Sequence, residues 1–181
     1  MGEVSEGPIL DGAAISRSMA IAPGIRAVSL KNTGPSSIEG TVSVSNVGEF
    51  LSGGAESSFI IYTEGRAAGS SSLVFFLDRS SAPLLISRLS PEIEEYLTAL
   101  MAPVVLGEES SRQEYLDLLA MVYGRPLADE ISAARIRATI EFPRPLTALS
   151  GGTASGNRGE FDISLLDVLV LERPLRYEAL W

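Results

Sequence analysis

One long region of this chain spaces its apolar residues as helices do, and it lies between two flanks whose apolar residues alternate as in strands. The region covers residues 81–134. Regular alternation of strands and helices is absent, so we expect an α+β fold. We predict a mostly antiparallel sheet of about seven strands, with a central block of about three short helices packed on one face.

Helix signals divide the central region into three parts. Ser90-Pro91 combines an N-cap serine with a proline in the first turn, and predicts a helix that ends at Pro103. The capping-box pattern over residues 111–114 predicts a second helix, which ends at Gly124. A third helix is expected over residues 126–134. Helices this short are marginal alone in water, so they need the flanks to bury against.

The N-terminal flank is predicted to form two hairpins. Apolar and polar residues alternate over residues 26–32 and 37–45, with turn residues between them. Residues 58–63 and 71–78 are almost continuously apolar, which is typical of strands central in a sheet. A loop of small residues joins these two runs.

The C-terminal flank is predicted to be mostly strand. Strands are expected over residues 135–142, 146–149, 161–165 and 175–181. We expect a loop over the glycine-rich residues 150–157. Residues 168–171 are predicted to form a buried run or a short helix.

The length of 181 residues is enough for one domain with a sizeable core. We expect residues 1–10 to form a flexible lead-in and residues 11–181 a single α+β domain. The alternative is a division into two subdomains near Ser80. Asp11 is placed to cap a short helix over residues 13–19.

Charge and residue types exclude several classes of function. The formal net charge of -9 opposes binding to nucleic acid, because that binding depends on Lys and Arg at the phosphates. The chain has no cysteine, which excludes disulfides and thiolate catalysis. It also has no histidine, the commonest metal ligand and general base. We therefore expect no metal and no cofactor.

Membrane and export signals are absent from the sequence as given. No apolar run approaches the roughly 20 residues that cross a bilayer, so no transmembrane segment is expected. Residues 1–12 lack the basic region and apolar core of a signal peptide. A membrane tether is expected only if the natural N-terminus has been removed.

Paired carboxylates are the remaining route to catalysis, as in glycoside hydrolysis. The candidates are Asp162 and Asp167, in an apolar segment where a carboxylate is costly to bury unless it is paired. The alternative is a structural role, such as a helix cap, a bulge or an ion pair with Arg173 or Arg176. The glycine cluster over residues 151–156 lacks the lysine of a phosphate-binding loop.

Large side chains of the predicted helices could line a cavity for an apolar ligand between helices and sheet. These residues are Tyr96, Met101, Tyr115, Met121 and Tyr123. The alternative is that the same residues are simply core, since pockets are few in any protein.

Several runs in the second half of the chain resemble a family. These runs cover residues 114–119, 123–124, 128–131 and 161–172. They resemble uncharacterised bacterial envelope lipoproteins over about half of the chain, and are more loosely similar to the LppM-type domain. The resemblance implies an α+β domain outside the cytoplasmic membrane, tethered by lipid and without known catalysis. The chain departs from the family because it has neither a signal peptide nor a lipid-bearing cysteine.

The function expected from these observations is a non-catalytic binding or structural domain of the bacterial cell envelope or periplasm. Its partner would be a protein or a small apolar ligand. A cytoplasmic location is expected instead if the sequence has its natural N-terminus. The alternative function is a carboxylate-dependent hydrolase such as a glycosidase.

Overall fold

The computed structural model describes residues 11–34, 37–52, 59–67, 69–87 and 91–181. The chain divides into two compact units, unit 1 (Met1–Glu56) and unit 2 (Ser57–Trp181). This boundary does not fall near Ser80, because the strand before Ser80 pairs with the last strand of the chain inside unit 2. The single domain over residues 11–181 stays a prediction, and the lead-in over residues 1–10 lies outside the described residues.

Unit 1 contains a helix, a long hairpin and a second short helix. In chain order these are α1 (Gly12–Ala20), β1 (Ile25–Gly34), β2 (Ser37–Val44) and α2 (Val47–Ser52). Asp11 caps α1 as predicted, since its side chain accepts hydrogen bonds from the N–H groups of Ala13 and Ala14. The antiparallel pairing of β1 with β2 confirms the first predicted hairpin.

Helix α1 lies against β1 through two polar contacts. The Ser16 hydroxyl accepts a hydrogen bond from the Leu30 N–H at 3.0 Å, and the Asn32 side-chain oxygen accepts one from the Gly12 N–H at 3.0 Å. Gly12 permits this approach, because a Cβ there would lie 3.2 Å from the Asn32 side-chain oxygen. Gly12 is also the only buried residue among the described residues of unit 1. Hydrogen bonds therefore matter more to unit 1 than an apolar core does.

The strands of unit 2 form two antiparallel sheets in the described part of the chain. The first sheet has the order β3-β4-β9-β6, with β3 (Ile60–Thr63), β4 (Ser72–Leu77), β9 (Leu175–Leu180) and β6 (Ala148–Ser150). The second has the order β5-β8-β7, with β5 (Arg135–Glu141), β8 (Arg158–Ser164) and β7 (Thr153–Ser155). The predicted loop over residues 150–157 is therefore wrong at β7.

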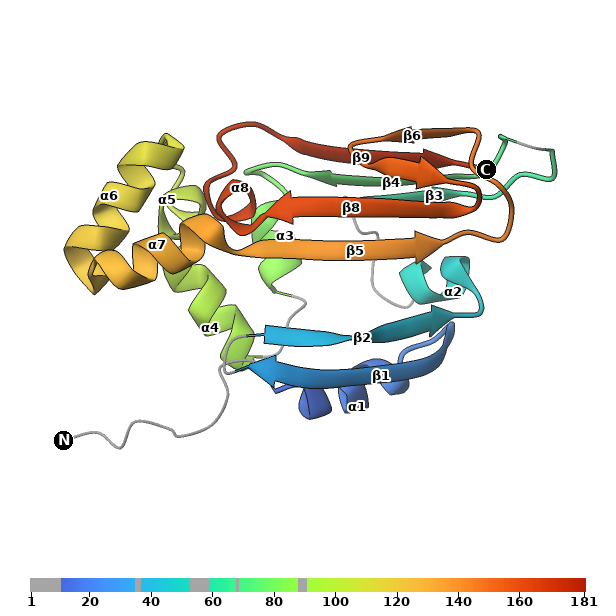
Figure 1. The fold of residues 1–181 in the computed structure, drawn as a ribbon, viewed down its shortest axis with the longest axis horizontal. Helices are drawn as coiled ribbons and strands as arrows, with labels where there is room; N and C mark the ends of the chain where they lie inside the picture. Colours follow the sequence, from blue (N-terminus) through green and yellow to red (C-terminus); the bar gives the residue numbers. More distant parts are fainter. Residues whose placement is uncertain (1–10, 35–36, 53–58, 68, 88–90) are drawn as a thin grey trace. The chain divides into compact units, whose positions relative to one another are not determined.

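The two sheets of unit 2 lie next to each other in Figure 1. Aromatic side chains pack between them. Phe161 of β8 meets Tyr177 of β9 edge to face, with ring centroids 5.8 Å apart. Near the other end of β9, Phe142 and Trp181 lie 4.8 Å apart in a second apolar cluster. The described residues thus hold nine strands in three sheets, counting β1-β2, where the sequence predicted about seven in one. The α+β class and the antiparallel pairing are confirmed.

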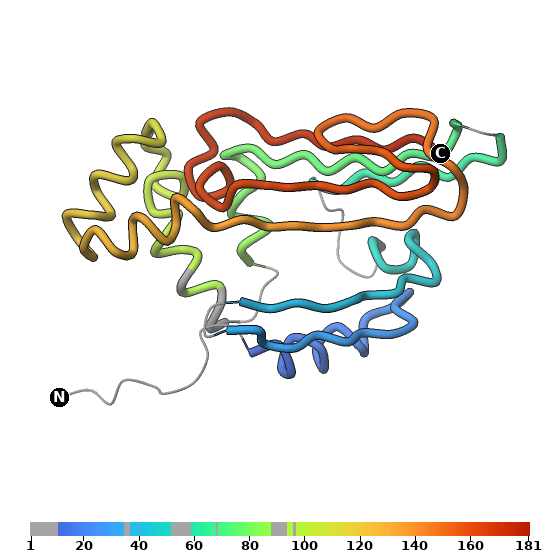
Figure 2. The backbone as a smooth tube through the Cα atoms, in the orientation of Figure 1, coloured from blue at the N-terminus to red at the C-terminus, as the bar shows by residue number. Residues whose placement is uncertain are grey.

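Gly151 and Gly152 explain why the predicted single sheet splits in two. They join β6 of the first sheet to β7 of the second, and Figure 2 shows the chain turning there. Gly151 has a φ of 80°, which favours glycine. A Cβ on Gly152 would lie 2.5 Å from the Glu160 carbonyl oxygen. Larger residues would not allow this corner.

In the part of the chain that the structure describes, five helices separate β4 from β5, where the sequence predicts about three. They are α3 (Ala82–Ile86), α4 (Pro91–Leu100), α5 (Ala102–Val105), α6 (Arg112–Tyr123) and α7 (Arg125–Ala133), and α8 (Leu165–Val170) follows β8. The capping box of Ser111 and Glu114 is confirmed at the start of α6. Pro103 does not end a helix but lies in the first turn of α5, where its missing N–H costs nothing. The predicted N-cap Ser90 lies outside the described residues.

The helices cluster at one end of the two sheets and not on one face. Their core contains Tyr115, Leu119 and Met101, and it reaches the first sheet at Leu77 and Leu175, which pair at the end of the β4-β9 ladder. One face of each sheet is instead packed against the other sheet. Among the described residues, no helix is both long and apolar enough to cross a membrane.

Candidate functional site

The sheet β5-β8-β7 has one polar face, because side chains alternate between the two sides of each strand. The register places Arg137 opposite Asp162, Thr139 opposite Glu160, and Glu160 opposite Thr153. The residues of this polar face are Arg135, Arg137, Thr139, Glu141, Thr153, Ser155, Arg158, Glu160 and Asp162. The other side carries Ile136, Ala138, Ile140, Phe161 and Ile163, with Phe161 directed toward Tyr177.

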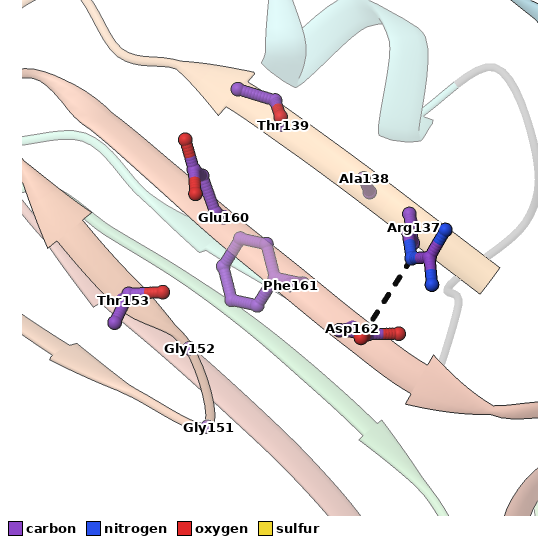
Figure 3. Close-up of a pocket in the computed structure, with 9 residues that line it drawn as sticks. All are labelled: Arg137, Ala138, Thr139, Gly151, Gly152, Thr153, Glu160, Phe161 and Asp162. Carbon is purple, nitrogen blue, oxygen red and sulfur yellow. Dashed lines mark ion pairs between the residues drawn. The ribbon is translucent and has the colours of Figure 1, made fainter. Parts of the chain in front are cut away.

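A groove open to solvent lies on the polar face, with a volume of about 470 Å³. It is lined by Arg137, Ala138, Thr139, Gly151, Gly152, Thr153, Glu160, Phe161 and Asp162, which Figure 3 shows in close-up. Three strands and the corner at Gly151 and Gly152 contribute to it. The groove therefore exists only because β7 folds back beside β8.

Asp162 is held by two arginines of β5. Its carboxylate lies 2.9 Å from Arg135 Nε and 3.8 Å from Arg137 Nε, and Arg135 also donates to the Asp162 carbonyl oxygen at 3.2 Å. The hydrogen bond from Arg135 lowers the pKa of Asp162, and the same contact raises the pKa of Arg135. Asp162 is therefore ionised near neutral pH and unsuited to act as a general acid.

Glu160 is the carboxylate of the groove that the sequence analysis did not select. It sits in the middle strand, with Thr139 across from it on β5 and Thr153 across on β7. It forms no ion pair with any residue that the structure describes. The alternation of Arg158, Glu160 and Asp162 in the sequence was the available signal.

Asp167 does not line the groove with Asp162. It lies in α8, where its carboxylate pairs with Arg112 Nη1 of α6 at 3.1 Å. The sequence predicts, as the structural alternative, a helix cap, a bulge or an ion pair with an arginine such as Arg173 or Arg176. The partners are instead arginines distant in sequence, and the predicted pairing of the two aspartates as catalytic groups is not supported by one shared pocket.

A second open pocket of about 400 Å³ lies beside the start of α6. It is lined by Arg79, Glu109, Ser110, Ser111, Glu114 and Glu172. Its best-placed groups already have structural partners. Glu114 closes the capping box, and its hydrogen bond from the Ser111 N–H lowers its pKa. Arg79 donates to the carbonyl oxygen of Leu171, a residue with a φ of 46°.

Of the residues predicted to bind an apolar ligand, Met101 and Tyr115 share one buried core, whereas Met121 and Tyr123 are exposed. Met101 and Tyr115 are each 1 % exposed, and the Tyr115 hydroxyl donates to the Leu100 carbonyl oxygen at 2.7 Å. Burial raises the pKa of Tyr115 to about 12. Met121 is 78 % exposed and Tyr123 56 %. The side chain of Tyr96 lies outside the described residues, and neither pocket above is lined by any of the five.

Two further observations concern metal ions and related proteins. In the part of the chain that the structure describes, no group of three or more Asp and Glu side chains is placed to hold a metal ion. No protein-family model, curated protein or solved structure matches the chain.

Proposed function

We propose that this chain is a non-catalytic binding or structural domain of the bacterial cell envelope, and that the groove on the polar face is its ligand-binding surface. The observation that carries the proposal is the chemistry of the groove, where Asp162 is neutralised by Arg135 and Arg137 while Glu160 has no ion-pair partner among the described residues. Such a surface offers fixed donors and acceptors to a ligand, and the lowered pKa of Asp162 makes that carboxylate unsuited to act as a general acid.

The mixed lining of the groove favours an uncharged ligand rich in hydroxyl groups, such as an oligosaccharide. Glu160 accepts hydrogen bonds, Arg137 donates them, and the hydroxyls of Thr139 and Thr153 do both. A strong anion would meet two carboxylates, and a strong cation would meet Arg137. An apolar ligand between helices and sheet would have to displace the core contacts of Met101 and Tyr115, so we place the ligand on the polar face.

Titration with neutral oligosaccharides tests the proposal. Cello-, malto- and chitotetraose are added to the ¹⁵N-labelled chain, and the amide signals of the groove residues are followed by NMR. We expect at least one sugar to shift the signals of residues 137–139, 151–153 and 160–162. Glu160→Gln should weaken that binding about tenfold, as expected for loss of a charged hydrogen-bond acceptor. The control Asp129→Asn removes an exposed carboxylate from α7 and should change nothing. Absence of shifts at millimolar sugar would overturn this ligand class.

A carboxylate-dependent hydrolase is the second candidate, because Glu160 and Asp162 project from the same face of β8. Two residues apart along a strand, their Cα atoms are separated by about 6.6 Å, a spacing that allows their carboxyl groups to reach the roughly 6.5–9.5 Å separation of inverting glycosidases. In this candidate Glu160 replaces Asp167 as the partner of Asp162. Product analysis of the same sugars separates the two functions. Cleavage that is lost in both Glu160→Gln and Asp162→Asn would favour the hydrolase, and binding without cleavage would favour the binding domain.

The envelope location in the proposal is motivated by the resemblance to envelope lipoproteins. Antibody detection of the natural protein in membrane, periplasmic and cytosolic fractions tests it. Recovery in the membrane or periplasmic fraction is expected. Recovery in the cytosol alone would overturn the location while leaving the groove proposal open to its own test.

A further inference from the structure

Strand β5 has one free edge within unit 2. Its other edge pairs with β8, and among the described residues no strand pairs with the free one. The Phe142 N–H donates to the Asn157 carbonyl oxygen, and the Ala134 carbonyl oxygen accepts from the Leu165 N–H, so even-numbered residues direct their backbone groups toward β8. Backbone groups alternate in direction along a strand. The free edge is therefore formed by the N–H and C=O groups of Arg135, Arg137, Thr139 and Glu141.

Among the described residues of unit 2, β5 lacks several features that protect an edge strand, although it carries charged side chains of both signs, Arg135, Arg137 and Glu141. Short length, an internal proline, a bulge or a covering helix normally prevents an exposed edge from pairing. The β5 strand spans seven residues without proline, and its register with β8 is continuous from Arg135 to Glu141. Its Ile136, on the apolar side of the sheet, remains 43 % exposed. This edge is therefore competent to accept another strand.

We propose that β5 pairs antiparallel with β5 of a second copy of this chain, around a twofold axis at Ala138. The two three-stranded sheets would then form one six-stranded sheet with an isologous interface. In this register Arg135 lies opposite the second copy's Glu141, and Arg137 lies opposite the second copy's Thr139. These are the residues whose backbone groups face the free edge, so each opposite pair can exchange two hydrogen bonds.

Charge complementarity and ladder length together select this register over its neighbours. It creates two Arg135 to Glu141 pairs across the interface, places each Ile136 against an Ile140 and gives all seven residues of β5 an opposite residue. A shift of two residues in one direction places Arg137 opposite itself, and like charges directly opposite are destabilising. A shift of two in the other direction also pairs arginine with glutamate, Arg137 with Glu141, but it leaves Arg135 and Ile136 without an opposite residue in β5. A shift of one residue turns the backbone groups away from each other.

Pairing of two β5 strands does not depend on the proposed ligand, but it would change how the grooves are arranged. A twofold axis perpendicular to the sheet keeps both polar faces on the same side. Two grooves would then lie on one continuous surface, which a repetitive ligand could bridge. Because one strand pair is a small interface, we expect an equilibrium that depends on concentration.

Charge reversal tests the proposal by sedimentation velocity over a range of concentrations. The wild-type chain should form dimers, and Arg135→Glu and Glu141→Arg should each weaken dimerisation by about tenfold or more. An equimolar mixture of these two variants should restore dimers, because in the mixed dimer each residue 135 faces a residue 141 of opposite charge. Glu95→Arg makes the same charge change as Glu141→Arg at an exposed position of α4 and should leave dimerisation unchanged. A wild-type chain that stays monomeric at high concentration would overturn the proposal, as would dimers that Glu141→Arg leaves intact.

Cysteine cross-linking tests the register, and it keeps the proposal testable if Arg135→Glu fails to fold. The natural chain has no cysteine, so each variant carries a single thiol. Ala138→Cys places the two thiols opposite each other in a non-hydrogen-bonded pair, with Cα atoms about 4.5 Å apart. That distance permits a disulfide. Arg137→Cys and Thr139→Cys should cross-link much less, because in this register each faces a different residue. Cross-linking that favours either of these two variants would overturn the register centred on Ala138, and no cross-linking by Ala138→Cys would overturn the pairing of β5.

Discussion

Strands β1 of unit 1 and β5 of unit 2 are both long antiparallel edge strands, but their outer edges differ in what contacts them within each unit. The Leu30 N–H of β1 points to α1 and is accepted by Ser16, and Asn32 accepts from Gly12. The β1-β2 register is also interrupted twice. The outer edge of β5 has neither a covering helix within the described residues of unit 2 nor an interruption. The comparison indicates that contact with a helix of the same unit, rather than the amino-acid composition of the strand, determines which strand edge can pair with another chain.

The largest expected effect comes from proline at a position of β5 whose N–H points toward β8. Ala138→Pro removes an N–H that points toward β8, and it should destabilise unit 2 by about 3 kcal/mol or more. Thr139→Pro removes an N–H on the free edge and should cost far less, since proline is tolerated where the N–H faces solvent. Chemical denaturation at low protein concentration measures both values. Equal losses of unfolding free energy in Ala138→Pro and Thr139→Pro would show that the assigned direction of the β5 backbone groups is wrong.

The same pair of variants sharpens the comparison at high concentration. Thr139→Pro should keep unit 2 folded while it abolishes dimers, because each Thr139 supplies two hydrogen bonds to the opposite strand in the proposed pairing. A folded Thr139→Pro chain that still forms wild-type amounts of dimer would show that β5 is not the dimer edge.

An intermediate effect is expected at the covered edge of β1. Ser16→Ala removes the acceptor of the Leu30 N–H and should destabilise unit 1 by about 1–2 kcal/mol. Hydrogen exchange of the Leu30 amide is the direct measurement, and exchange should accelerate locally because the described part of unit 1 has almost no buried side chains. Ser18→Ala, on an exposed position of the same helix, is the matched control. Unchanged exchange at Leu30 in Ser16→Ala would mean that α1 does not protect this edge.

Local signals in the sequence predicted much of the fold. The Asp11 cap and the Ser111 capping box are confirmed because each depends on residues within one helical turn. The apolar alternation of β5 and the two N-terminal hairpins are confirmed for a similar reason. The division into separate sheets could not be read from the sequence, since it depends on Ser72 meeting Leu180 across most of unit 2. Strand β7 was missed because Thr-Ala-Ser carries no apolar alternation.

The candidate site was predictable only in part. Asp162 was selected because it lies in an apolar segment, but its partner Arg135 is 27 residues away in the sequence and joins it through the β5-β8 register. Glu160 was missed because a carboxylate on the polar side of an alternating strand looks like any solvated residue. The groove itself depends on the corner at Gly151 and Gly152, and that corner was predicted as an undefined loop.

The smallest expected effect compares the ion pairs of the two edge strands as pH changes. Asp162 has a pKa lowered by Arg135, so its contribution to stability is present above the pKa of an unfolded aspartate and is lost as the pH falls through the lower folded value. The difference in unfolding free energy between wild type and Asp162→Asn should therefore be largest near neutral pH and vanish in acid. In unit 1, Lys31 and Glu39 pair at 3.7 Å with side chains that are 72 % and 70 % exposed, so Glu39→Gln should have less effect at every pH. Urea denaturation from pH 2 to 7 measures both differences. If Asp162→Asn lowers the unfolding free energy equally in acid and at neutral pH, the Asp162 side chain stabilises β8 through packing and not through its charge.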